Sequence, residues 1–198
     1  MRLSSWFKLP IVMVAGMAAG LMCSIFLFHS IKDVTSIDID GWQHNANVGS
    51  ENASALSRTV ISIMGFLGLS REETVYFLAD RDTEGEPLES ACEYTVNGRI
   101  TSEHARWWSI TAYNTKTQKL IENSEDKYSY TGDTIVFNDD GSFSINIAAS
   151  KQQGNWIPVS EKTSFDLLLR LYNPTAFVTK QTQTLMLPKI IKGHCHEK

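Results

Sequence analysis

The segment that most constrains this chain is residues 106–113, which read Arg-Trp-Trp-Ser-Ile-Thr-Ala-Tyr. Aromatic and β-branched residues dominate it, and its side chains alternate with a period of two, which is typical of a β-strand with one buried face. Trp108 and Ile110 are expected to point into a core, while Trp107 and Tyr113 lie on the opposite face. A domain built around this strand is expected to be mainly β.

The same pattern recurs after residue 74 in short segments that are separated by turn residues. We expect strands at residues 75–79, 92–96, 134–138, 143–149, 165–172 and 185–191. Residues 139–142, Asp-Asp-Gly-Ser, predict a hairpin turn, and Pro188 makes the last segment an edge strand. Since no helical crossovers separate the strands, we predict an antiparallel β-sandwich over residues 71–195. Its core is expected to contain Trp108, Ile110, Ile145, Ile147, Leu167 and Leu169.

Residues 9–28 carry no charge, and a helix of this length is about 30 Å long, which matches the hydrocarbon core of a bilayer. Arg2 and Lys8 precede this run, whereas mainly acidic residues follow it, so residues 1–8 are expected in the cytoplasm and the remainder outside. We predict a transmembrane signal anchor at residues 9–30. A cleaved signal peptide is the alternative, but no small-x-small cleavage site follows the run. Gly16 and Gly20 form a GxxxG pair, which predicts a homodimer through this helix, although such pairs also arise by chance.

Between the anchor and the sandwich we expect a polar linker at residues 31–52 and an amphipathic helix at residues 53–70. Trp42 is the one large apolar residue of the linker and is expected to contact either the domain or the lipid headgroups. Ser54 or Asn52 can cap the helix, and Gly68 can end it. Its apolar stripe is Leu56, Val60, Ile63, Met64 and Leu67, and residues 196–198 are a short tail.

The cysteines indicate a covalent link rather than a metal site. Cys92 and Cys195 are the only cysteines outside the apolar run, and an oxidising compartment favours a disulfide between them, with two free thiols as the alternative. His194 and His196 flank Cys195, but neighbouring residues in an extended tail seldom converge on one ion. We therefore expect a disordered tail and no metal. No motif predicts a cofactor, and the net charge of −4 without a dense basic run argues against nucleic acid.

Several aromatic and polar residues lie outside the expected core. Their flat rings, guanidinium and amide suit a sugar ring or an anion, so we take them as candidate ligand-binding residues. The alternative is that they pack against a sheet, the helix or a loop, with Arg170 paired to Asp166 on the same strand face. The candidates are Trp107, Tyr113, Asn155, Trp156, Arg170 and Tyr172.

The ordered motifs of this chain resemble those of domain-of-unknown-function family 1214. They begin with Gly41-Trp42, are densest at residues 105–113, and continue through residues 139–143, 154–158, 169–174 and 187–191 to Cys195. The resemblance implies a jelly-roll-like β-sandwich in a bacterial envelope protein. It implies the short, membrane-anchored form, which lacks the family 1254 domain that precedes the same domain in other members. It supplies no catalytic residues.

Three classes of function are compatible with these observations. The first is a periplasmic binding or assembly module on the bacterial inner membrane, whose partner is an envelope glycan, a small anion or an envelope protein. The second is a hydrolase that acts on envelope glycans, and the third is a purely structural envelope protein. Because no local catalytic signature occurs, we expect the first class rather than an enzyme.

Overall fold

The structure is a computed structural model that describes residues 5–34, 36–63, 68–160 and 162–196. The chain divides into two compact units, with the boundary between Ser36 and Ile37. The first unit is the helix α1 (Ser5–Val34). Its window Leu9–Phe26 has a mean hydropathy of 2.1 and is long and apolar enough to cross a membrane. The expected helix is therefore present, while its insertion into a bilayer stays a prediction.

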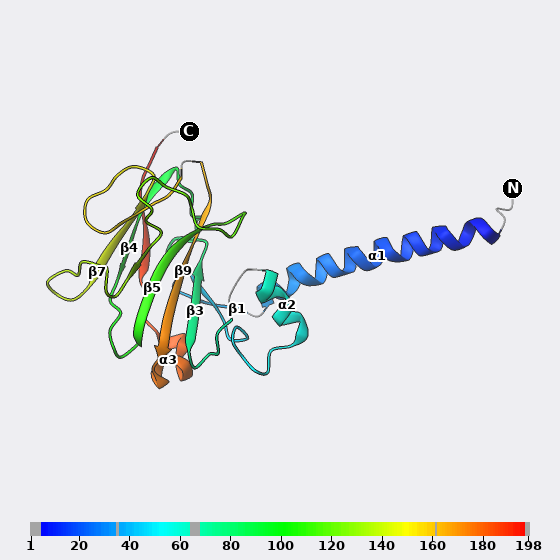
Figure 1. Cartoon of the computed structure of the whole chain (residues 1–198), viewed down its shortest axis with the longest axis horizontal. Helices are drawn as coiled ribbons and strands as arrows, with labels where there is room; N and C mark the ends of the chain where they lie inside the picture. The colour runs from blue at the N-terminus through cyan, green and yellow to red at the C-terminus, as the bar shows by residue number, and fades with distance from the viewer. Residues whose placement is uncertain (1–4, 35, 64–67, 161, 197–198) are drawn as a thin grey trace. The chain divides into compact units, whose positions relative to one another are not determined.

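The second unit contains two β-sheets (Figure 1). The six-stranded sheet has the order β1 (Ser36–Ile39), β2 (Trp42–Asn45), β3 (Thr74–Ala79), β9 (Phe165–Pro174), β5 (Ala105–Asn114) and β6 (Ser129–Thr131). The four-stranded sheet has the order β10 (Lys189–Cys195), β4 (Cys92–Gly98), β7 (Phe143–Ala148) and β8 (Trp156–Pro158). β7 and β8 run parallel, whereas β4, β5 and β9 pair antiparallel with their neighbours.

One hydrophobic core is shared by the two sheets, so the unit is a β-sandwich. The core includes all six residues expected from the alternation: Trp108, Ile110, Ile145, Ile147, Leu167 and Leu169. Trp108 stacks on Phe143 across the two sheets, with ring centroids 4.8 Å apart. The mainly β fold class is confirmed, and the parallel β7–β8 pair is the departure from a purely antiparallel arrangement.

Residues 36–45 of the expected linker are instead part of the six-stranded sheet. β1 and β2 extend the six-stranded sheet, and Gln43 lies opposite Leu78 of β3. Asp40 and Gly41 both have positive φ, 53° and 86°, which is the backbone conformation of a two-residue hairpin turn. Trp42 is fully buried, and its Nε1 donates a hydrogen bond of 2.6 Å to the carbonyl of Pro188. Of the two expectations for Trp42, contact with the domain is the correct one.

The expected strand at residues 134–138 is wrong, although the turn that follows it forms. Asn138 accepts a hydrogen bond from the Gly141 amide, and Asp140 accepts one from the Ser142 amide. The segment before the turn has no strand partner because the Asn155 amide takes that place. Asn155 accepts from the Val136 N–H at 2.9 Å and donates to the Val136 carbonyl at 2.8 Å. The strand that pairs with β5 here is the shorter β6.

The ends of the helix and of the last strand also differ from expectation. α2 (Ala55–Ile63) is capped by Ser54, whose Oγ accepts a hydrogen bond of 3.1 Å from the Ser57 N–H. The helix is described as far as Ile63, so its expected continuation to Gly68 falls on residues 64–67, which lie outside the described residues, as do the side chains of the apolar stripe. β10 begins after Pro188 and is an edge strand, as predicted. Two short helices, α3 (Ala176–Lys180) and η1 (Thr182–Thr184), precede it and were not expected.

A disulfide joins the edge strand β10 of the four-stranded sheet to its neighbour β4. Cys92 of β4 and Cys195 of β10 are linked with an S–S distance of 2.01 Å, and the two residues are register partners. The predicted disulfide is therefore confirmed. The expectation of a disordered tail around His194 and His196 is wrong, because β10 extends to Cys195 and the His196 amide donates to the Ala91 carbonyl at 2.8 Å. Residues 197 and 198 lie outside the described residues.

Candidate functional site

The face of the six-stranded sheet that is turned away from the core carries four of the six candidate residues. We call it the outer face. Alternation along β9 places Leu167, Leu169 and Leu171 in the core and Arg170 and Tyr172 on the outer face. The register of β5 against β9 sets Trp107 beside Tyr172, Ser109 beside Arg170, Thr111 beside Leu168 and Tyr113 beside Asp166.

Arg170 is held at one end of the outer face by two hydroxyl groups. Its Nη2 donates a hydrogen bond of 2.6 Å to Tyr113 Oη, and its Nη1 donates one of 3.3 Å to Thr111 Oγ1. The guanidinium carbon lies 5.5 Å from the centroid of the Tyr113 ring. Among the described residues, no salt bridge within 4.0 Å joins Arg170 to Asp166, which was the alternative expected from the sequence. Arg170 is therefore a partly exposed cation without a carboxylate partner in the described part of the chain.

Asp166 is engaged by other groups on the same face. Its Oδ1 accepts a hydrogen bond of 2.7 Å from Thr115 Oγ1, and its Oδ2 accepts one of 3.4 Å from Gln118 Nε2. Asp166 is almost fully buried, so these bonds fix the segment after β5 across the end of the sheet. The carboxylate thus stabilises the loop that follows β5.

Trp107 and Tyr172 form an aromatic pair at the other end of the outer face. Their ring centroids are 4.9 Å apart and the ring planes are inclined by 57°. Trp107 Nε1 donates a hydrogen bond of 2.7 Å to Asp133 Oδ2, which fixes the orientation of the indole. Both side chains keep part of their surface exposed. The two rings therefore offer apolar surface whose position is fixed by their mutual contact and by the hydrogen bond to Asp133.

The aromatic pair and the Arg170 guanidinium are separated along the strands. Thr111, which binds the guanidinium, lies four residues after Trp107 in β5, a distance of about 13 Å at the rise of an extended strand. Ser109 lies between them and has a short, buried side chain. The four residues share one face, as alternation predicted, but they form two pairs rather than one cluster.

Asn155 and Trp156 belong to a different part of the molecule, the edge of the four-stranded sheet. Besides Val136, the Asn155 amide donates to the Ser144 carbonyl at 2.9 Å, and the residue is 7% exposed. Trp156 Nε1 donates to the Ala148 carbonyl at 3.0 Å, and its backbone N–H donates to Tyr130 Oη at 2.9 Å. These side chains hold backbone segments together, and they do not join the other four candidates.

Tyr76 and Thr111 belong to the outer face and were not among the candidates. Tyr76 lies opposite Arg170 in register, and burial raises the pKa of its hydroxyl, an effect that a hydrogen bond with the Leu69 backbone opposes. Thr111 has the parity of Trp107 and Tyr113, so alternation could have selected it. The position of Tyr76 depends on the pairing of β3 with β9, which are distant in sequence and cannot be aligned from composition.

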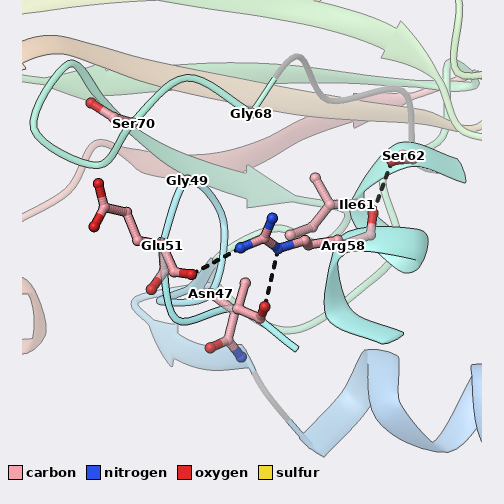
Figure 2. A pocket seen from close by; sticks show the side chains of 10 residues that line it. Asn47, Gly49, Glu51, Arg58, Ile61, Ser62, Gly68 and Ser70 are labelled. Atoms are coloured by element: carbon pink, nitrogen blue, oxygen red, sulfur yellow. Dashed lines mark hydrogen bonds between the residues drawn. The ribbon is translucent and has the colours of Figure 1, made fainter. Parts of the chain in front are cut away.

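A pocket of about 450 Å³ lies at the segment that contains α2 (Figure 2). Arg58 reaches across it and donates hydrogen bonds to the backbone carbonyls of Glu51, at 2.8 Å, and Ala53, at 3.1 Å. The guanidinium therefore ties α2 to the segment before it. None of the candidate residues lines this pocket, whose described walls are Asn47, Gly49, Ser50, Glu51, Ala53, Arg58, Ile61, Ser62, Gly68 and Ser70.

The resolved shifts in pKa arise from folding contacts rather than from converging catalytic groups. Burial lowers the pKa of His44, whose Nδ1 lies 3.0 Å from the Tyr76 carbonyl oxygen. Burial raises the pKa of Tyr94. Hydrogen bonds from Ser142 in the turn lower the pKa of Asp140. Within the described ranges, no group of three or more His, Cys, Asp or Glu side chains is arranged to hold a metal ion.

The sequence was compared with known protein families. Residues 73–176 match the family described as "Protein of unknown function (DUF1214)", which is more than half of the chain. The chain belongs to this family. The matched DUF1214 region begins just before β3 and ends at the start of α3, so it contains β5 and β9 with the whole set Trp107, Tyr113, Arg170 and Tyr172. No curated protein matches the chain.

A solved structure supports the fold of this DUF1214 protein. The VPA0106 protein from Vibrio parahaemolyticus is similar with a TM-score of 0.60 at 22% identity, over 72% of this chain and 36% of that protein. A putative uncharacterized protein from Burkholderia cenocepacia matches at 20% identity with a TM-score of 0.40, over 64% of this chain and 31% of the other. The present chain thus spans about a third of the length of these proteins.

Proposed function

We propose that this DUF1214 protein is a single-pass binding module of the bacterial inner membrane, with its domain in the periplasm and its ligand on the outer face. The observation that carries the proposal is Arg170, a partly exposed guanidinium that is fixed by Tyr113 and Thr111 and has no ion pair in the described residues. A charge that is oriented by neutral hydroxyls suits recognition of a ligand that supplies the opposite charge.

Two features support the proposed location. α1 contains an apolar window of membrane-spanning length, and the basic residues Arg2 and Lys8 precede it. Disulfides such as Cys92–Cys195 persist in oxidising compartments, of which the bacterial periplasm is one. Both features favour a cytoplasmic N-terminus and a periplasmic domain.

Recognition is favoured over catalysis because Asp166, the carboxylate beside Tyr113 on the outer face, is buried and accepts hydrogen bonds from Thr115 and Gln118. A general acid or base is expected to show a pKa that is shifted by a neighbouring charge in a cleft. The largest cause of the shifts of His44, Tyr76 and Tyr94 is burial instead. Arg170, Trp107 and Tyr172 offer charge and ring surface without a group that would accept a proton from a substrate.

The proposal is tested with the full chain in detergent against peptidoglycan fragments, lipopolysaccharide sugars and small organic acids. We expect at least one of them to raise the thermal midpoint, and we expect Trp107→Ala to remove this shift. Trp156→Phe is the matched control on the other sheet and should leave it unchanged. Hydrolysis of a bound compound, abolished by substitution of one carboxylate, would show an enzyme and overturn the proposal. A shift that survives Trp107→Ala and Arg170→Met would place the site elsewhere.

A further inference from the structure

We infer that Arg170, Tyr113 and Thr111 form an anion subsite, and that the ligand is an acidic oligosaccharide that extends from this subsite to the Trp107–Tyr172 pair. The inference rests on the proposed function, because it assigns a class of ligand to the same face. It adds a chemical identity and a minimum length, both of which follow from the arrangement of donors and rings.

The anion preference follows from the hydrogen-bond inventory around Arg170. The hydroxyls of Tyr113 and Thr111 each accept an N–H from the guanidinium, so the proton of each hydroxyl is free to be donated elsewhere. A guanidinium has five N–H donors, of which these two bonds use two. The three side chains therefore carry hydrogen-bond donors that a negatively charged acceptor can use. A carboxylate matches the planar fork of arginine through two parallel hydrogen bonds.

The length follows from the separation of the two pairs. About 13 Å of strand lies between Trp107 and Thr111, which is longer than a single sugar ring. Ser109 lies between them on the same face and is buried, with Arg170 beside it in register. A ligand that contacts both pairs is therefore a chain of rings, with one ring on the aromatic pair and a carboxylate at Arg170.

An acidic peptide is the other extended ligand of this charge, and the strand positions argue against it. Peptides that bind to sheets usually add a strand at an edge, where backbone N–H and C=O groups are unpaired. β9 lies between β3 and β5, and β5 lies between β9 and β6, so their ladders have partners on both sides. The outer face offers side chains rather than backbone groups, which favours a glycan.

The test is calorimetric titration of the full chain in phosphatidylcholine nanodiscs with trigalacturonic acid. The matched probes are neutral galactotriose, which has the length without the charge, and galacturonic acid, which has the charge without the length. We expect the acidic trimer to bind about tenfold or more tightly than either probe. Arg170→Met should remove the preference for the acid, and Trp107→Ala should bring the trimer close to the monomer. Arg99→Met removes an exposed arginine after β4 and should change affinity less than about twofold.

Two conservative variants, Arg170→Lys and Tyr113→Phe, separate a loss of binding from a loss of folding. Each keeps most of the side-chain volume, and each should weaken only the charged ligands, because lysine lacks the planar fork and phenylalanine lacks the hydroxyl. Equal binding of the acidic and neutral trimers would overturn the anion subsite and leave the proposed binding function standing. Binding of an acidic hexapeptide in place of both sugars would overturn the glycan. If no ligand of the wider panel shifts the thermal midpoint either, the proposed function falls as well.

Discussion

Leu168 and Leu169 test how the cost of truncating a buried side chain depends on the face of the sheet on which it lies. They are neighbours in β9 and are 3% and 0% exposed, but Leu169 is part of the core whereas Leu168 is on the outer face. Leu169→Ala is expected to lower the free energy of unfolding by about 2–5 kcal/mol, since it opens a cavity between the sheets. Leu168→Ala should cost less because Leu168 lies outside the core between the sheets, with Thr111 and the half-buried Leu78 beside it in register. Denaturant unfolding of both variants measures this, and a larger loss for Leu168→Ala would reverse the assignment of faces.

His44 is expected to make stability depend on pH. It is buried, its Nδ1 donates to the Tyr76 carbonyl, and its Nε2 has no partner in the described residues. Burial is the main reason for its lowered pKa, and the charge of Arg71 acts in the same direction. The unfolded chain therefore takes up a proton at a higher pH than the folded chain does.

The free energy of unfolding should accordingly fall as the pH drops below about 6.5, with a slope of up to about 1.4 kcal/mol per pH unit, and level off below the folded pKa. Thermal unfolding of the full chain between pH 5 and pH 8 gives the slope. His44→Gln should flatten it, whereas His194→Gln, at an exposed histidine, should not. An unchanged slope in His44→Gln would assign the effect to another group.

Asn155 should prove structural rather than ligand-binding. Its amide makes three hydrogen bonds to backbone atoms of Val136 and Ser144. Asn155→Ala removes the side-chain partner of these part-buried backbone groups, so we expect a loss of about 1–3 kcal/mol in the free energy of unfolding. Ligand binding by the folded fraction should stay unchanged. A variant of normal stability with lost binding would return Asn155 to the candidate site.

At the scale of elements, the disulfide fixes β10 to β4. It closes a loop with a sequence separation of 103 residues, for which the chain-entropy description gives up to about 4.7 kcal/mol. We expect Cys195→Ser to lower the thermal midpoint in oxidising buffer to that of the reduced wild type. Cys23→Ser, at the free cysteine of α1, should have no effect on the domain. Alkylation of the native chain without reductant, followed by intact mass, should modify only Cys23.

The strands that were predictable are those with strong alternation. In β5, β7 and β9 the side chains of the two faces differ clearly. The alternation along the sequence therefore predicted both the strand and the residues that it contributes to the core. β1 and β2 were mistaken for a linker because each has four residues and polar side chains. Asp40-Gly41 is a hairpin signal that was available in the sequence. The false strand at residues 134–138 reflects an Asn155 contact that periodicity does not encode.

The candidate site was predictable to the extent that it depends on parity. Alternation placed Trp107, Tyr113, Arg170 and Tyr172 on one face, and the structure agrees. Their division into two pairs depends on the register of β5 against β9 and on the direction of the Arg170 side chain. The misplacement of Asn155 and Trp156 has another origin, since a loop and a three-residue strand carry no parity signal. The division into two pairs and the positions of Asn155 and Trp156 both depend on long-range strand pairing, which is set by the packing of the whole core.

At the scale of the whole molecule, the topology can be tested with single thiols in a Cys23→Ser background. Gly49 is unsuitable, because a side chain there would overlap the Leu69 carbonyl. Glu84 is exposed in the turn region before β4. We expect Glu84→Cys to react with a membrane-impermeant maleimide in intact spheroplasts and Ser5→Cys to react only after permeabilisation. The reverse pattern, or a mature mass that begins after residue 20, would exclude the proposed topology.

The strand order also determines when the domain can fold during synthesis. β9 lies between β3 and β5 but is made after both, so neither of these strands can complete its ladder until residues 165–174 have been synthesised. Until then the emerging chain exposes two unpaired strand edges, which are a template for aggregation. Pairing between such distant segments is slow, because loop closure has to precede the contacts that reward it. Under the proposed topology, a periplasmic chaperone rather than the native sheet has to shield β3 and β5 during this interval.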